Sequence, residues 1–214
     1  MREEEKSALF EQAQKHLDQA KNERDFYNSQ VEAAKSAWQS SESGKHAPSL
    51  GHYSYDFAQH IHFPYSAMQT GPEFFKTARK CGIFGVCNDG KSELVMYLID
   101  EAENPGKGTD CVISMLDHYF DKYGNNEKSL YLPADNCTAQ NKNNATVQYL
   151  MSRVMTGKQE SIQLSFMIVG HTKFSPDRHF GTFKKAFRHS TVSTIDEIAS
   201  VVESQQPTSR MCLS

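Results

Sequence analysis

The sequence predicts an α/β protein in which a mixed five-stranded sheet is flanked by helices and preceded by one long helix. Three observations predict this fold. Residues 3–38 are rich in Glu, Ala, Gln and Lys and contain no Gly or Pro, which favours a continuous helix. Three strand-like segments then follow one another across short polar turns, and two further short apolar segments alternate with helical patterns. Strands that alternate with helices are typical of a sheet covered on both faces.

In the predicted N-terminal helix, apolar side chains recur at alternating steps of four and three residues, with one interruption at Arg24. The stripe consists of Ala13, Leu17, Ala20, Arg24, Tyr27, Val31, Ala34 and Trp38. Such a heptad-like stripe predicts that the helix either pairs with another helix in a coiled coil or lies against the core. We therefore expect a long helix over residues 1–40 and a polar linker, with Gly44 and Pro48, over residues 41–50.

Three consecutive strands are expected after the linker. They cover residues 52–63, 81–87 and 93–99. In the first, apolar and polar side chains alternate, which predicts a half-buried strand with Asp56 on its polar face. Between the second and third strands, Asp89 followed by Gly90 is typical of a hairpin with the positive φ angles of a type I′ turn.

Helices and strands alternate in the rest of the chain. The expected helices cover residues 112–124, 138–155, 176–187 and 194–202, and the expected strands cover residues 130–134 and 162–169. On the second of these helices, the side chains expected to face the core are those of Val147, Leu150, Met151 and Val154. Thr194 and Glu197 match a capping box at the start of the last helix. The order β-β-β-α-β-α-β-α is that of the ribonuclease-H fold, expected over residues 51–190 and followed by a short helix and tail over 191–214.

Three aspartates fall where such a fold gathers functional groups, near the carboxyl ends of strands. Asp56 lies within the first strand, Asp135 directly follows the fourth, and Asp177 lies just past the fifth. Converging carboxylates repel one another unless a cation lies between them, and oxygen ligands suit Mg²⁺ or Mn²⁺. Two such ions about 4 Å apart can activate a nucleophile and stabilise the leaving oxygen of a phosphoryl displacement. Each aspartate also has a structural alternative. Asp56 could be a solvent-facing strand residue, Asp135 a turn or helix-cap residue, and Asp177 an acid in the first turn of a helix.

Three blocks carry a resemblance to a known family. They are Tyr55-Asp56-Phe57-Ala58-Gln59 with Pro64 and Gln69-Thr70-Gly71-Pro72, then 134–143, then 170–181. Over roughly residues 50–190 the chain resembles transposon-derived proteins that have a DDE-type, ribonuclease-H-like integrase domain. The resemblance implies cleavage and strand transfer of DNA, with Asp56, Asp135 and Asp177 as catalytic residues and ligands of two metal ions. The chain has neither zinc-finger spacing nor a clear helix-turn-helix, so a fragment of a longer transposase is an alternative.

Other polar residues near these acids are candidates for contacts with substrate. His171 is a catalytic candidate that could hydrogen-bond the scissile phosphate or a metal-bound water, or simply bind backbone near the turn. The candidates for DNA contacts are Gln140, Asn141, Lys142, Asn144, Lys173, Arg178, Lys184 and Lys185. Glu101 or Glu103 is an alternative auxiliary ligand. His60 and His62 lie on the polar face of the first strand, but the absence of a partner pair at ligand spacing argues against zinc.

Charge and composition bound the partners. The net charge of −3 argues against nucleic-acid binding, but residues 142–189 carry eight basic and two acidic residues, a local charge of +6. This segment predicts a phosphate-binding surface, with a solvated helix face as the alternative. The chain has no apolar run of roughly 20 residues and no signal-like N-terminus, so we expect an intracellular protein without membrane contact, and a nuclear one if DNA is its substrate. Five cysteines without a C-x-x-C argue against a disulfide scaffold or zinc ribbon.

Two other functions fit the same sequence. The chain could be a non-catalytic interaction or DNA-binding scaffold that forms homo-oligomers through its N-terminal helix. It could also be an RNA-directed nuclease of the same fold.

Overall fold

A computed structural model of the protein describes residues 3–41, 47–68, 71, 75–103, 106–168, 170, 173–205 and 209–213. The helices are α1 (Glu3–Ser40), α3 (Thr109–Tyr123), α4 (Asn144–Met155), α5 (Ser175–Phe187) and α6 (Ile195–Gln205), with a 3-10 turn at Glu101–Glu103. The strands are β1 (Leu50–Phe63), β2 (Arg79–Asn88), β3 (Glu93–Asp100), β4 (Ser129–Ala134), β5 (Ser161–Phe166) and β6 (Ser209–Leu213).

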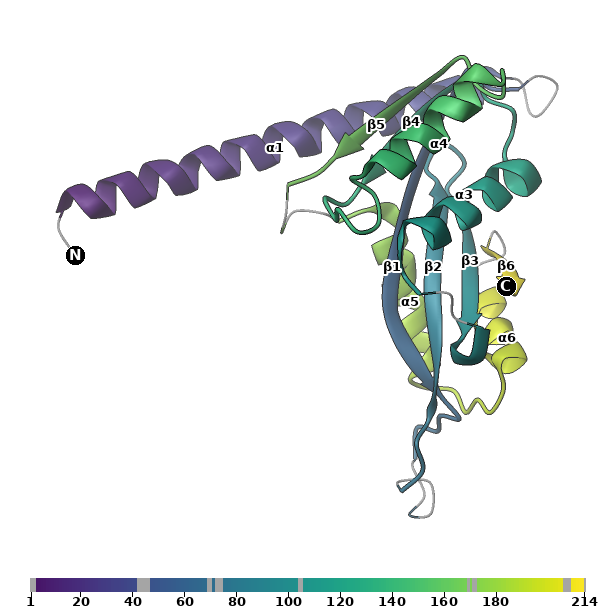
Figure 1. The fold of residues 1–214 in the computed structure, drawn as a ribbon. Coiled ribbons are helices and arrows are strands. Elements are labelled where there is room, and N and C mark those ends of the chain that lie inside the picture. The colour runs from purple at the N-terminus through teal and green to yellow at the C-terminus, as the bar shows by residue number, and fades with distance from the viewer. Residues whose placement is uncertain are drawn as a thin grey trace.

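The strands form one mixed sheet in the order β5-β4-β1-β2-β3-β6 (Figure 1). β1, β2 and β3 pair antiparallel as a meander, and β4 pairs parallel with β1 on the other side. β5 continues the sheet parallel to β4. The five strands β1 to β5 therefore have the arrangement of a ribonuclease-H-like fold, as the element order predicts.

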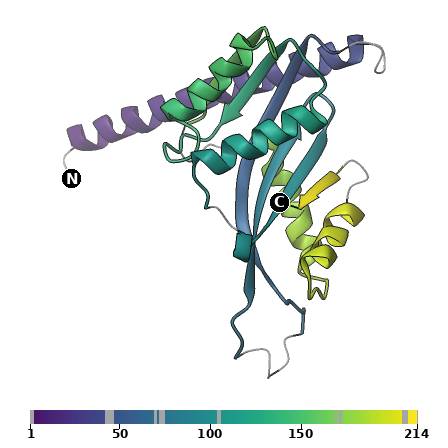
Figure 2. The same cartoon turned by 45° about the vertical axis from the view of Figure 1, so that its right-hand side comes forward.

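Both faces of the sheet are covered, and each face has its own core. Figure 2 shows α3 and α4 on one face, with α5 and α6 on the other. Tyr53 and Tyr55 of β1 belong to the core beneath α3 and α4, whereas Ala58 belongs to the core beneath α5 and α6. A shift in the β1–β2 register between Ala58 and Ile61 reverses the alternation beyond it, because Ile61 and Phe63 also belong to the core beneath α5 and α6. The alternation read from the sequence therefore holds only as far as Ala58, where it directs Asp56 away from the α3–α4 face, and it is wrong for Ile61 and Phe63.

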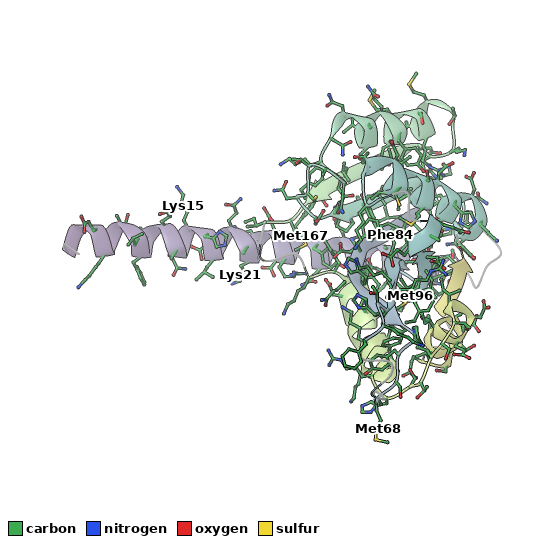
Figure 3. The ribbon with its side chains drawn as sticks, turned by 60° about the horizontal axis from the view of Figure 1, so that its bottom comes forward. Lys15, Lys21, Met68, Phe84, Met96 and Met167 are labelled. Carbon is green, nitrogen blue, oxygen red and sulfur yellow. The ribbon has the colours of Figure 1, made fainter. Side chains whose placement is uncertain are left out.

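The long helix α1 has two different halves. Its C-terminal half packs on the body of the protein, where Ala20, Tyr27 and Ala34 are buried. Tyr27 contacts the His52 ring edge-on at 5.1 Å between centroids and lies against Phe174. Side chains from position 5 to position 19 are all exposed, and Figures 1 and 3 show this half extending away from the sheet. The heptad-like stripe thus lies against the core from Ala20 onward.

The hairpin turn between β2 and β3 differs from the type I′ turn that the sequence predicts. The positive φ angle, 58°, occurs at Ser92 and not at Asp89 or Gly90. The difference in the turn arises from tertiary contacts of Asp89, whose side chain is buried. Its Oδ2 accepts hydrogen bonds from His52 Nδ1 at 2.7 Å and from Ser54 Oγ at 2.8 Å. These bonds hold Asp89 inside the protein and move the left-handed residue to the end of the turn.

The helix after β4 is shorter than expected and buries a different face. It begins at Asn144 with Asn143 as its N-cap, and turns occupy residues 138–141. Leu150 is buried as predicted, but three of the residues expected to face the core are exposed: Val147 45%, Met151 56% and Val154 36%. That expectation was wrong because β5 is the last strand of the sheet, so none of the described helices or strands lies beyond it to cover the outer flank of α4.

The C-terminal segment adds an element that the sequence does not predict. The capping box at α6 is confirmed, since Thr194 Oγ1 accepts the Glu197 amide at 3.3 Å and Glu197 accepts the Ser193 amide at 2.5 Å. Beyond α6, however, β6 pairs parallel with β3, where we expected a frayed tail. Within the described part of the chain, no helix combines the length and apolar character needed to cross a membrane.

Candidate active site

The sheet brings the first two aspartates to the same level. Parallel pairing of β1 with β4 matches Leu50 to Ser129 and His52 to Tyr131. Asp56 lies four residues beyond His52 on β1, and Asp135 lies four residues beyond Tyr131, directly after β4. The two strands are 79 positions apart along the chain in this register, so their approach depends on the fold and on no local contact.

The third aspartate arrives from the helix that covers this part of the sheet. Asp177 lies in the first turn of α5, and α5 packs against β1 and β2. The fit between this helix and the sheet is tight at Gly85, which pairs with Asp56 across β1 and β2. A Cβ on Gly85 would lie 2.7 Å from Cζ of Phe180. Only a glycine therefore allows α5 to approach the strand so closely beside Asp56.

The electrostatics of Asp56 show that the charges of the other two carboxyl groups reach it. Burial raises the pKa of Asp56 to about 7, and the negative charge of Asp177 is the second cause. Asp135 raises it further, whereas the hydrogen bond from the Phe57 amide and the charge of Lys107 lower it. Two carboxylates that both oppose ionisation of a third form the kind of site where a cation is stabilising.

Each aspartate is also held by a hydrogen bond of its own. The Phe57 amide donates to Asp56 Oδ1 at 2.7 Å, and Asn141 Nδ2 donates to Asp135 Oδ1 at 2.5 Å. The backbone amide of Phe174 donates to Asp177 Oδ2 at 2.9 Å. The turn and first-turn roles considered as alternatives for Asp135 and Asp177 are therefore both present. Among the described residues, the second oxygen of each of the three carboxylates accepts no hydrogen bond and is available to another ligand.

The donor chemistry fits a hard divalent cation, because every candidate ligand is a carboxylate oxygen. The described side chains do not by themselves enclose such a cation. In the described ranges, no group of three or more His, Cys, Asp or Glu side chains is arranged so as to hold a metal ion. The alternative ligand Glu101 is engaged elsewhere, since its Oε2 accepts the Lys80 amide at 2.9 Å. His60 and His62 are exposed on the same strand, and His60 Nδ1 lies 3.3 Å from Lys107 Nζ.

One residue beside these acids was not singled out by the sequence. Lys107 lies close enough to Asp56 for each charge to affect the pKa of the other. Burial lowers the pKa of Lys107, and its Nζ lies 5.1 Å from the centroid of the Phe57 ring. Its sequence signal is weak, because a lysine between two glycines resembles any exposed loop residue.

The residues predicted to contact DNA are distributed over three places. Asn141 is buried, and its amide is directed to Asp135. Lys142 is exposed at the end of β5, with its Nζ 5.4 Å from the Phe166 ring centroid, and Gln140 and Asn144 lie beside it in the chain. The remaining four lie on or just before α5. Lys173 and Arg178 are exposed at its first turns, while Lys184 and Lys185 belong to its last turn. His171 lies outside the described residues.

Comparison with known proteins gives one match. A family model described as Domain of unknown function (DUF7869) matches residues 76–212, a range that contains Asp135 and Asp177 but not Asp56. Neither the curated proteins nor the solved structures contain a significant match.

Proposed function

The chain belongs to the DUF7869 family, and from this premise we propose that it is a metal-dependent core for DNA strand cleavage and transfer, resembling a DDE transposase. One observation carries the proposal. On a ribonuclease-H-like sheet, Asp56 lies within electrostatic reach of both Asp135 and Asp177, and its pKa is raised to about 7. Carboxyl groups that oppose the ionisation of a neighbouring acid are more typical of a functional site than of a structural one.

The roles proposed for the aspartates follow from the contacts that hold them. Asp56, Asp135 and Asp177 are the ligands of Mg²⁺ or Mn²⁺, with two ions bound. A metal pair in such a site supplies an activated nucleophile and stabilises charge on the leaving oxygen. Asn141 orients Asp135, and the Phe174 amide orients Asp177. Lys107 balances part of the negative charge on this site until a cation is bound.

Positive charge near α5 supports a polyanionic substrate. Lys173 and Arg178 flank Asp177 in sequence and are exposed, so their side chains can reach the phosphates of a bound strand. Lys142 extends this basic surface on the side of Asp135. His171, between β5 and α5 in the chain, remains a proposed catalytic residue. If DNA is the substrate, the protein acts in the nucleus, and imaging of a tagged full-length chain would test that part.

A nicking assay with purified full-length protein tests this function. Labelled DNA, RNA and hybrid duplexes would be incubated with Mg²⁺, with Mn²⁺ and with a chelator. We expect metal-dependent cleavage of DNA that is lost in Asp56→Asn and Asp135→Asn. Cleavage of RNA or the hybrid in place of DNA would favour the RNA-directed alternative.

The matched control is Asp196→Asn, because Asp196 is an exposed first-turn acid of α6 on another helix. This variant should cleave as the unmodified protein does. Cleavage that persists in Asp56→Asn, or no Mn²⁺ binding by the unmodified protein in calorimetric titration, would overturn the proposed activity.

A second candidate function, a non-catalytic interaction module, is favoured by the protruding half of α1. Leu9, Phe10 and Leu17 are 54%, 71% and 55% exposed there. Large apolar side chains on a protruding helix are typical of a helix-pairing surface. We propose that this half pairs with α1 of a second copy.

Light scattering compares the full chain with a variant that lacks residues 1–19, which leaves the packed half of α1 in place. The expected result is a dimer that becomes a monomer on deletion, and Phe10→Ser should weaken the dimer. A monomeric full chain, or an unchanged mass after deletion, would contradict pairing through this helix.

A further inference from the structure

A cavity of about 390 Å³ lies between α1 and the segment that leads from β5 into α5. The residues that line it are Leu17, Ala20, Lys21, Arg24, Gly170 and Lys173. Among the described residues of this lining, half are cationic and none is acidic. Asp18, Glu23 and Asp25 are neighbours in sequence, but none of them lines the cavity, and the Glu23 carboxylate accepts the Ile168 amide at 2.7 Å.

The cations are brought together from two distant parts of the chain. Lys21 and Arg24 lie one turn apart on α1, and Lys173 directly precedes the N-cap of α5. Lys21 and Lys173 are exposed, and within the described residues neither ammonium group has an acidic partner. Three like charges around one cavity raise the local positive potential, which favours an anion between them.

One wall of the cavity is fixed in place. Arg24 Nη1 donates a hydrogen bond to the carbonyl oxygen of Lys173 at 2.6 Å, and its guanidinium carbon lies 5.4 Å from the centroid of the Tyr27 ring. Tyr27 is buried, and its hydroxyl lies 3.3 Å from Ser175 Oγ. The position of α1 relative to the start of α5 is therefore set by direct contacts. These contacts also fix how close Lys21 and Arg24 lie to Lys173.

The cavity adjoins the proposed active site through the backbone. Lys173 is followed by Phe174, whose amide donates to the Asp177 carboxylate. We propose that this cavity binds a backbone phosphate of the nucleic-acid substrate, on the α1 side of the catalytic aspartates. The inference rests on the proposed function and adds α1 to the substrate surface, although the helix as a whole is acidic and its sequence pattern predicts no site chemistry.

DNA-binding measurements on the full chain test the cavity without requiring catalysis. Fluorescence anisotropy with a labelled DNA duplex, in a chelator and at several salt concentrations, gives both affinity and its salt dependence. The variant Lys21→Ala, which changes only the α1 side of the cavity, should bind more weakly, and the slope of log K against log salt should fall by about 1 as one phosphate contact is lost. The Lys21 ammonium group is exposed and lacks an acidic partner among the described residues, so the melting temperature should not change.

Lys15→Ala is the matched control. Lys15 is exposed on the same helix but outside the cavity, and Figure 3 shows it farther from the body of the protein than Lys21. The control should keep the affinity and slope of the unmodified protein. If Lys21→Ala also keeps them while the unmodified protein binds DNA, the phosphate site is overturned and the proposed function stands. If the unmodified protein binds neither DNA nor RNA at any salt concentration, both proposals are overturned.

Discussion

Replacing Asp56 by asparagine should stabilise the metal-free protein at neutral and alkaline pH. Asparagine keeps the side-chain oxygen that accepts the Phe57 amide at 2.7 Å and removes a charge that burial, Asp177 and Asp135 all oppose. A gain in stability from a variant that abolishes activity is the signature of a site built for chemistry at a cost to folding.

The magnitude follows from the proton linkage. The carboxyl titrates with a pKa of about 7 in the folded protein and near 3.8 in the unfolded chain. Because the folded state holds its proton to higher pH, the free energy of unfolding falls as pH rises from 3.8 toward 7 and then levels off. At about 1.4 kcal/mol per pH unit, the loss reaches at most about 4 kcal/mol. The Asp56→Asn variant avoids this loss, so its advantage is absent at low pH and complete above a pH of about 7.

Urea unfolding in a chelator, at several pH values from about 4.5 to about 8 that bracket the titration, would measure this difference for the unmodified protein, Asp56→Asn and the control Asp196→Asn. The gain in Asp56→Asn should grow to about 2–4 kcal/mol at the alkaline end, and the control should show no such trend. Adding Mn²⁺ there should stabilise the unmodified protein but not Asp56→Asn, because ligand binding to the folded state adds to stability. A destabilised Asp56→Asn at the alkaline end, or a difference that does not vary with pH, would refute the reasoning.

Three further substitutions test the fold around the site. Gly85→Ala should destabilise the protein by about 1–3 kcal/mol, because the added Cβ would lie 2.7 Å from the Phe180 ring; an unchanged melting temperature would contradict this close packing. Arg153→Ala should lower the free energy of unfolding by about 2 kcal/mol in chemical denaturation. The variant removes a buried guanidinium and, with it, the 2.8 Å contact to the half-exposed Asp117 carboxylate. An unchanged free energy of unfolding would mean that the pair contributes nothing. Asn143→Ala should cost at least about 1 kcal/mol, because the N-cap of α4 accepts a first-turn amide at 3.0 Å and its own amide donates to Thr109 Oγ1 and to the Thr138 carbonyl oxygen; an unchanged free energy of unfolding would argue against this cap.

Local patterns account for the features that the sequence predicts well. The alternation along β1 fixes which face Asp56 occupies, because successive side chains of a strand point to opposite faces whatever the strand pairs with. The capping box at Thr194 likewise depends on residues within one turn, and the structure contains it. Long helical stretches such as residues 3–40 follow from composition in the same way.

Features that depend on neighbours distant in the chain were not predictable. Val147, Met151 and Val154 have the period of a core-facing stripe, yet they are exposed because β5 ends the sheet. Asn141 reads as a polar surface residue, but the turn after β4 folds it back to hold Asp135. A helical or turn pattern predicts which side chains share a face. It does not predict whether a neighbouring element will cover that face.

The sequence by itself therefore determined the order of the elements, the face of β1 that Asp56 occupies, and the places of Asp135 after a strand and Asp177 in the first turn of a helix, since each depends on spacing within one segment. The tertiary structure alone decided that the charges of Asp135 and Asp177 reach Asp56, because the β1–β4 register and the packing of α5 at Gly85 join residues 79 or more positions apart. It also decided that α1 brings Lys21 and Arg24 beside Lys173. Such approaches follow from how whole elements pack, and packing is a property of the folded chain.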